Sequence, residues 1–136
     1  MKITASIQSG FEKHRVEIAT QGQVSHLDIP IKAGGFGSAI NGGEFLCLAL
    51  ATCYCNDIYR EAAKRNIPIE SLEVHVQSDF EKEGAGASRI SYQVRIRSGA
   101  SEEETRALAM HTDTVAEIQN TIRHLSAITL DKIEIG

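Results

Sequence analysis

The stretch NGGEFLCLALATCYCNDIYREAAKR, residues 41–65, decides the fold of this chain. From Phe45 to Cys55 it is apolar on every side of a helix, and charged residues become frequent only after Asn56. A helix that is apolar all round is surrounded by protein. We therefore expect a buried central helix against which the rest of the chain packs.

The start of this helix carries a capping signal. Asn41 can accept a hydrogen bond from a first-turn N–H group, and Glu44, three residues later, can reach back to the backbone of residue 41. The glycine-rich loop before it, residues 32–43, has the outer glycine spacing of a phosphate-binding loop. Gly43 and Glu44 stand where Lys and Ser or Thr are required, and a carboxylate at a helix start repels phosphate. We interpret this loop as a flexible lead into the helix.

The segments on either side alternate between apolar and polar residues, which is typical of strands. Ser101 and Glu104 form a second capping box, followed by an apolar stripe that includes Leu108 and Leu125. Strands broken by two helices, without regular βαβ alternation, indicate an α+β fold in one domain, residues 1–136. The predicted elements are an N-terminal antiparallel meander (1–8, 14–20 and 24–31), the central helix, a β-hairpin (71–80 and 88–97), a second long helix and a closing strand (128–135).

Composition narrows the classes of function. The chain has 136 residues, a formal net charge of -4 and no tryptophan, so it lacks the basic stripe and the aromatic platform of nucleic-acid binding proteins. It has no leader pattern and no apolar segment near the ~20 residues of a membrane span. We expect a cytoplasmic protein with no nucleic-acid or membrane partner.

Three cysteines lie within nine positions of the central helix. Cys53 and Cys55 project about 200° apart, and Cys47 and Cys53 are about 9 Å apart along the helix axis. Disulfide-bonded cysteines need Cβ atoms within about 4.5 Å of each other, so no two of the three can pair inside an intact helix. The same divergence makes a metal site improbable. One interpretation that fits this pattern is that all three cysteines are small, buried residues whose thiols do not react.

The segment around Cys53, NGGEFLCLALATC, resembles the osmotically inducible protein C and organic hydroperoxide resistance family (OsmC/Ohr). Its members show an N-P-x-E-L-L-x-x-A-x-A-A-C segment, and the predicted order of elements agrees with theirs over nearly the full chain. The resemblance implies an intertwined homodimer in which two central helices are buried together, which would account for a helix apolar on all sides.

The resemblance also implies a catalytic set without a cofactor. In active members, the cysteine that matches Cys53 attacks an organic hydroperoxide as a thiolate and becomes a sulfenic acid. An arginine from the N-terminal region, held by a glutamate near the helix start, lowers the pKa of that thiol. The nearest matches to these two residues are Arg15 and Glu44.

Two departures separate this chain from the active pattern. Gly42 stands where the family has a proline after the asparagine, and Gly43 follows it before Glu44. The family's resolving cysteine lies on the second helix, where this chain has Ala116 and Glu117. A sulfenic acid at Cys53 would then be resolved by the partner subunit, by an external thiol, or after distortion by Cys47 or Cys55.

Four further residues are candidates for a pocket. Arg60 lies on roughly the same helix face as the reactive cysteine, but is also interpreted as a surface partner of Asp57. His111 interrupts the apolar stripe of the second helix, where a hydrogen-bonded core histidine is the commoner case. Gln119 and Asn120 would either present amides to a ligand or form an exposed helix face.

The candidate residues and the family resemblance are compatible with two functions. The first is one-cysteine reduction of an organic hydroperoxide through Cys53, with an external thiol as reductant. The second is non-catalytic binding of a small apolar or electrophilic molecule in a pocket at the dimer interface.

Overall fold

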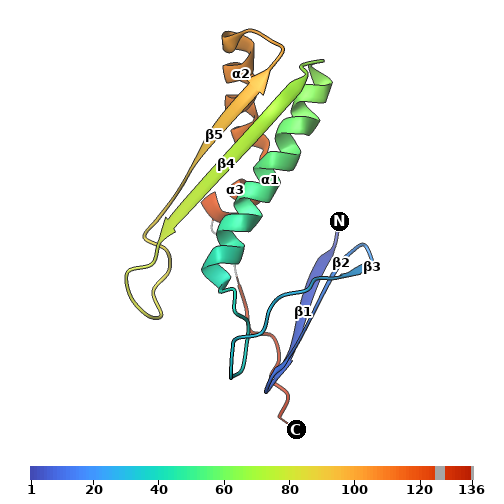
Figure 1. Cartoon of the computed structure of the whole chain (residues 1–136), viewed down its shortest axis with the longest axis vertical. Helices are drawn as coiled ribbons and strands as arrows, with labels where there is room; N and C mark the ends of the chain where they lie inside the picture. Colours follow the sequence, from blue (N-terminus) through green and yellow to red (C-terminus); the bar gives the residue numbers. More distant parts are fainter. Residues whose placement is uncertain (125–127, 136) are drawn as a thin grey trace. The chain divides into compact units, whose positions relative to one another are not determined.

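The computed structural model describes residues 1–124 and 128–135. The chain divides into two compact units, residues 1–45 and 46–136, and each is described by itself. The mixture of helices and antiparallel strands confirms the predicted α+β class, while the single-domain assignment stays a prediction. The elements are β1 (Ile3–Gly10), β2 (Lys13–Thr20), β3 (Gln23–His26), α1 (Gly42–Lys64), β4 (Ile69–Asp79), β5 (Arg89–Ser98), α2 (Glu102–Val115) and α3 (Glu117–Arg123) (Figure 1).

The first unit holds the predicted meander, an antiparallel sheet in the order β1-β2-β3. Gln21 and Gly22, with φ of 51° and 80°, make the two-residue turn between β2 and β3, where a right-handed strand twist requires positive φ. The register places Ile7 beside Val16 on one apolar face. Successive side chains alternate between faces, so the opposite face is polar. Much of the apolar face, including Ile3, Ile7 and Ile18, is exposed in the single chain.

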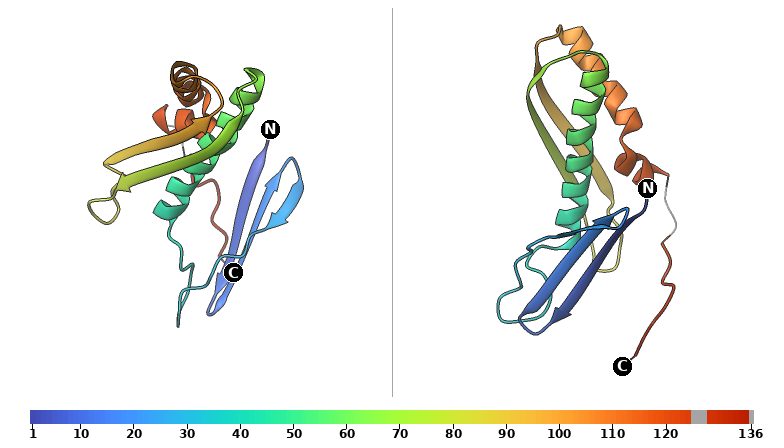
Figure 2. Two further views of the ribbon diagram at one scale, coloured as in Figure 1. Left: turned by 45° about the horizontal axis from the view of Figure 1, so that its top comes forward. Right: turned by 90° about the vertical axis from the view of Figure 1, so that its right-hand side faces the viewer.

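The core of the second unit lies between the β4–β5 hairpin and the helices. Cross-strand pairs such as Leu72 with Ile96 and Val74 with Val94 give the hairpin one apolar face. Both α1 and α2 lie on that face (Figure 2). Tyr54, Ile58 and Ala62 are spaced four residues apart on α1 and pack with Leu108 of α2 in the buried centre. The predicted hairpin is thus confirmed.

The end of α1 is fixed by backbone hydrogen bonds. Asn66 adopts a φ of 55° and donates its N–H to the Ala63 carbonyl at 3.2 Å, while Ile67 donates to the Ala62 carbonyl at 3.0 Å. This is the Schellman pattern, and Pro68 follows it. The helix therefore stops at a defined point, and β4 starts directly after it.

The predicted second long helix is two helices. Its capping box at Ser101 and Glu104 is confirmed, but Ala116 has an extended conformation (φ -71°, ψ 110°) that separates α2 from α3. The Nδ2 group of Asn120 donates to the Thr114 carbonyl at 3.0 Å and so satisfies a carbonyl in the last turn of α2. Leu125, the last member of the predicted stripe, lies outside the described residues.

The predicted closing strand is wrong for the single chain, because residues 128–135 have no strand assignment. A strand needs a neighbouring strand for its backbone hydrogen bonds, and the described part of the chain offers this segment none. Its apolar side chains are exposed, with Ile128 at 97% and Ile135 at 94%.

The central helix is buried on one face only. Leu48, Thr52, Asn56 and Tyr59 form an exposed stripe, with Leu48 at 59% exposure. Burial on all sides, as predicted from the sequence, is therefore not found in the single chain. None of the helices in the described ranges is long and apolar enough to cross a membrane.

We predict that Ile58→Ala destabilises the protein by about 2–5 kcal/mol, because Ile58 is fully buried and the lost atoms leave a cavity. Urea denaturation followed by circular dichroism would measure the change. The matched variant Ile58→Val should cost only about 0.5–1.5 kcal/mol. Equal effects of the two variants would contradict the packing described.

Candidate functional site

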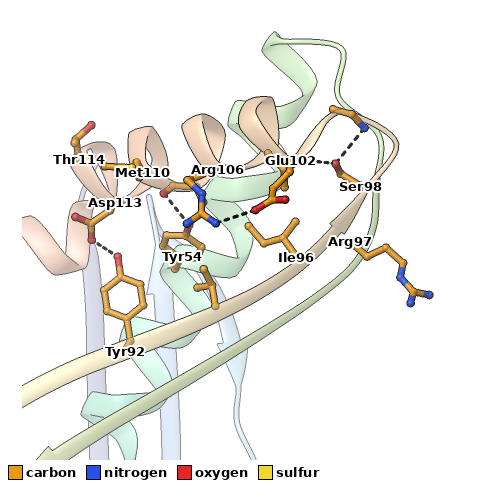
Figure 3. Close-up of a pocket in the computed structure, with 14 residues that line it drawn as sticks. Tyr54, Tyr92, Ile96, Arg97, Ser98, Glu102, Arg106, Met110, Asp113 and Thr114 are labelled. Atoms are coloured by element: carbon orange, nitrogen blue, oxygen red, sulfur yellow. Dashed lines mark hydrogen bonds and ion pairs between the residues drawn. The ribbon is translucent and has the colours of Figure 1, made fainter.

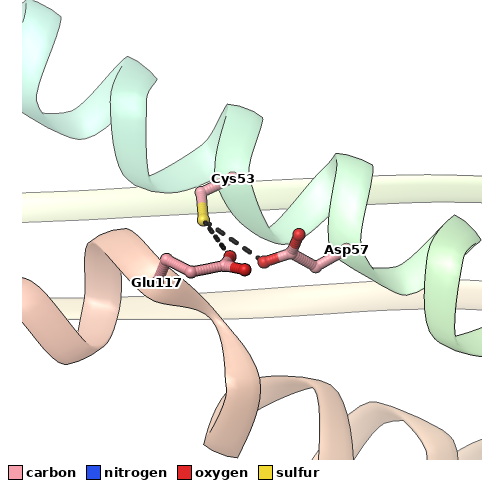
Figure 4. Close-up of side chains that lie close together, drawn as sticks. All are labelled: Cys53, Asp57 and Glu117. Carbon is pink, nitrogen blue, oxygen red and sulfur yellow. Dashed lines mark hydrogen bonds between the residues drawn. The ribbon is translucent and has the colours of Figure 1, made fainter. Parts of the chain in front are cut away.

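The Cys53 thiol lies between helices α1 and α3, where two carboxylates face it (Figure 4). Its Sγ donates to Asp57 Oδ2 at 3.3 Å and is 3.8 Å from Glu117 Oε2. It also accepts the backbone N–H of Ile118 at 3.5 Å. The half-buried thiol therefore has two proton acceptors and one donor around it.

Local structure explains how these groups meet. Asp57 is four residues after Cys53 on α1, so the two side chains are neighbours on one helix face. Glu117 and Ile118 belong to the first turn of α3, whose N–H groups have no partner within the helix. The extended backbone at Ala116 breaks the helix just before them. This break directs the first turn of α3 toward Cys53.

Arg60 links the two carboxylates. Its Nη1 is 2.9 Å from Asp57 Oδ1 and 3.2 Å from Glu117 Oε1, while its Nε donates to Glu61 Oε1 at 2.9 Å. The predicted pairing of Arg60 with Asp57 is thus confirmed. Asp57 and Glu117 each use one oxygen for the guanidinium and the other for the Cys53 thiol. The positive charge of Arg60 therefore acts on the thiol through the carboxylates.

The surroundings of Cys53 favour the thiol over the thiolate. Burial raises the pKa of Cys53, and the carboxylates of Asp57 and Glu117 raise it further, while the Ile118 N–H opposes the shift. Burial also raises the pKa of Asp57, and the neighbouring Glu117 carboxylate adds to this effect. A backbone N–H holds the pKa of Glu117 below its ordinary value, and Arg60 adds to that shift. At neutral pH Cys53 is a hydrogen-bonded thiol beside an unusually basic carboxylate.

His111, on α2, contacts the carboxylate of Glu61 on α1. Its Nε2 lies 3.2 Å from Oε2 of the buried Glu61, whose other oxygen accepts from Lys64 Nζ at 2.8 Å. Hydrogen bonds from Lys64 and Arg60 lower the pKa of Glu61 to about 2. His111 is therefore a hydrogen-bonded residue that joins α2 to α1, and its described contact is with Glu61 and not with Cys53.

The amide residues of α3 have structural contacts. Gln119 is buried, and its Nε2 donates to the Leu50 carbonyl at 2.9 Å, so it ties α3 to α1. The interpretation of Gln119 as part of an exposed helix face is wrong, because α3 turns this residue inward. Its Oε1 has no hydrogen-bond partner among the residues that the structure describes. Asn120 is half-buried and bonds to the end of α2.

The other two cysteines lie elsewhere on α1. All three thiols are free, as the helical geometry predicted. Cys47 Sγ lies 3.2 Å from Ser78 Oγ on β4, and Cys55 is half-buried. The structure therefore brings neither of them to the Cys53 thiol.

The remaining predicted site residues belong to the first unit. Glu44 Oε2 accepts the Asn41 N–H at 2.8 Å, and Asn41 Oδ1 accepts the Glu44 N–H at 2.9 Å, which confirms the capping box. Arg15 lies on the polar face of the sheet, beside Gln8, and pairs with Glu17 at 3.6 Å. The catalytic roles of Arg15 and Glu44 stay predictions.

One group of side chains has the composition of a metal site. Ligand atoms of Cys53, Asp57 and Glu117 lie within 4.8 Å of one another among the described residues. The Arg60 guanidinium already contacts both carboxylates, so a metal ion would have to displace it. We therefore interpret this group as an ion-pair network around a thiol.

An open groove of about 900 Å³ runs between β5 and α2 (Figure 3). The residues that line it include Tyr54, Tyr92, Val94, Ile96 and Ala109. Tyr54 donates its hydroxyl to the Ala109 carbonyl at 2.9 Å, and Tyr92 donates to Asp113. Cys53 does not line this groove, so thiol chemistry and groove binding are separable.

Comparison with known families gives a match to the OsmC-like protein family over residues 35–131. An OsmC-like protein from Mycoplasma pneumoniae has a similar structure, with a TM-score of 0.62 and 23% identity over 91% of this chain and 87% of that one. An organic hydroperoxide resistance protein OsmC from Legionella pneumophila gives a TM-score of 0.54 and 23% identity over 90% of each chain. An OsmC-like hydroperoxide resistance protein from a Jannaschia species gives a TM-score of 0.56 and 16% identity over 98% of this chain and 92% of that one. No curated protein sequence matches the chain.

Sequence reasoning missed the roles of Asp57 and Glu117 at this site. From the sequence we expect only a pairing of Asp57 with Arg60, although its position four residues after Cys53 places it on the same helix face. The sequence places Glu117, together with Ala116, in the segment where the resemblance puts the family's resolving cysteine. That correspondence is the available signal, because a resolving cysteine must reach the reactive thiol.

We predict that Glu117→Gln lowers the pKa of Cys53 and speeds its alkylation by iodoacetamide at neutral pH several-fold, since the change removes a negative charge beside the sulfur. Arg60→Ala should slow alkylation, because both carboxylates then lose their neutralising cation. The rates would be measured by mass spectrometry between pH 6 and 9 in a protein with Cys47 and Cys55 replaced by serine. Slower alkylation in Glu117→Gln would show that its carboxylate does not act on the thiol as described.

Proposed function

The chain belongs to the OsmC-like protein family, and from this premise we propose that it reduces organic hydroperoxides through Cys53 in a one-cysteine cycle. Solved structures with the same fold include proteins described as conferring organic hydroperoxide resistance. The observation that carries the proposal is the Cys53 thiol itself. The resemblance of the segment around it matches Cys53 to the family's reactive cysteine, and a carboxylate lies within hydrogen-bond distance to accept its proton.

The reaction needs one sulfur and an outside reductant. Cys53 sulfur attacks the distal oxygen of the hydroperoxide, the O–O bond breaks, and the products are a sulfenic acid and an alcohol. One external thiol then forms a mixed disulfide with Cys53 and releases water. A second thiol restores the Cys53 thiol and leaves as the external disulfide. Glu117 contacts Cys53 where the family's second cysteine would be expected, which supports a cycle that uses an external thiol.

We predict that tert-butyl hydroperoxide converts Cys53 to a sulfenic acid that dimedone traps. The adduct would be located by peptide mass spectrometry, and hydroperoxide loss would be followed in the presence of dithiothreitol. Cys53→Ser should abolish both signals, because it removes the nucleophile.

The control is the double variant Cys47→Ser/Cys55→Ser, which should retain both signals. A wild-type thiol that hydroperoxide leaves unmodified would contradict the proposal. That result would favour the second candidate function, binding of a small apolar molecule in the groove beside Tyr54 and Tyr92.

We also infer that the working form is a homodimer. The exposed stripe of α1, the exposed apolar face of the β1-β2-β3 sheet and the apolar segment 128–135 all leave large hydrophobic side chains in contact with water in the single chain. Apolar surface of this extent marks an interaction site. A second copy that covers these surfaces would also give the strand-like segment 128–135 a neighbour.

We predict that light scattering after size-exclusion chromatography gives twice the chain mass of 14.8 kDa. Leu48→Glu should shift the protein toward the monomer, because it places a charge in the exposed stripe of α1. Met110→Glu, at a similarly exposed position on α2, should leave the mass unchanged. A monomeric wild-type protein would contradict the inference.

A further inference from the structure

We propose that Asp57 carries the proton of the reaction, taking it from the Cys53 thiol and delivering it to the departing alkoxide. This inference rests on the proposed function. It assigns to a carboxylate on α1 the proton transfers that accompany both bond formation at sulfur and cleavage of the O–O bond.

The contacts of the Cys53 thiol favour Asp57 over Glu117 as the proton carrier. Cys53 Sγ donates to Asp57 Oδ2 at 3.3 Å, whereas Glu117 Oε2 is 3.8 Å away. Asp57 is almost fully buried, with 5% of its surface exposed, while Glu117 is exposed to solvent. Burial raises the pKa of Asp57, whereas a backbone N–H lowers the pKa of Glu117, and a base with a pKa nearer neutrality is the better proton carrier.

All charged groups around Asp57 fit this role. Arg60, on the same helix, contacts Asp57 Oδ1 at 2.9 Å and leaves Oδ2 to the thiol. Glu117, from α3, shares that guanidinium, and Glu61 pairs with its Nε. His111, from α2, reaches this network only through Glu61. Arg60 and Glu117 are therefore positioning residues that hold the carboxylate in place.

The proton transfers balance without another reactant. The thiol proton moves to Asp57 Oδ2 as sulfur bonds to the distal peroxide oxygen, which keeps its own hydrogen. The O–O bond breaks, sulfur is oxidised by two electrons, and the alkoxide takes the proton from Asp57 to leave as an alcohol. Asp57 is then a carboxylate again. A good leaving group departs without taking a proton, whereas an alkoxide needs this proton to leave as an alcohol.

The test compares two reactions of the same thiol in the Cys47→Ser/Cys55→Ser background. Iodoacetamide expels iodide, which needs no proton, whereas tert-butyl hydroperoxide expels an alkoxide. Asp57→Asn keeps the shape of the side chain and removes a negative charge beside the sulfur. We expect it to speed alkylation several-fold at pH 7 and to slow sulfenic acid formation at least about tenfold, the low end for general acid–base catalysis.

If Asp57→Asn does not fold, the pH dependence of sulfenic acid formation in the wild-type protein still tests the inference. Sulfenic acid formation should change little with pH between the pKa of Asp57 and that of the thiol, because ionised Asp57 takes the proton as the thiol reacts, whereas thiolate chemistry rises about tenfold per pH unit. Glu73→Gln, at an exposed carboxylate on β4 outside the Cys53 site, is the control variant and should retain the flat profile. An Asp57→Asn rate equal to wild type, or a wild-type rate that follows the thiolate fraction, would overturn the inference while leaving hydroperoxide reduction intact. Failure of the wild-type protein to form any sulfenic acid would instead overturn the proposed function.

Discussion

Two buried carboxylates on α1, Asp57 and Glu61, are the constraint on which the site depends. Burying a carboxylate costs several kcal/mol unless cations and hydrogen bonds compensate it. Arg60 contacts both carboxylates, and Glu117 from α3 and His111 from α2 complete the network. The need to neutralise these charges therefore ties three helices together. It also fixes the groups that surround Cys53.

The Glu117 carboxylate beside the sulfur limits the chemistry that Cys53 can perform. A second cysteine at this place would allow an internal disulfide, but a carboxylate there raises the pKa of the Cys53 thiol and accepts its hydrogen bond weakly. Cys53, the proposed nucleophile, is then a protonated thiol instead of a resting thiolate. Such a thiol needs a nearby base, and Asp57 meets that need from the same helix.

Local patterns explain why much of the fold could be predicted from the sequence. Capping boxes at Asn41 and Ser101, and the alternation in the hairpin, involve residues close along the chain. The break at Ala116 could not be predicted, because it depends on packing of α3 against α1 and on the Asn120 contact with α2. The position of Glu117 beside Cys53 follows from that break. Residues 128–135 have the pattern of a strand, but a pattern alone supplies no pairing partner.

We propose that Cys53 is a protonated thiol that nevertheless reacts with hydroperoxide. Infrared spectroscopy can follow its S–H stretching band directly, as the difference between wild-type protein and Cys53→Ser at pH 7. We expect a band shifted by a hydrogen bond, which disappears on addition of one equivalent of tert-butyl hydroperoxide. The absence of a band before addition, or a band that the hydroperoxide leaves in place, would contradict it.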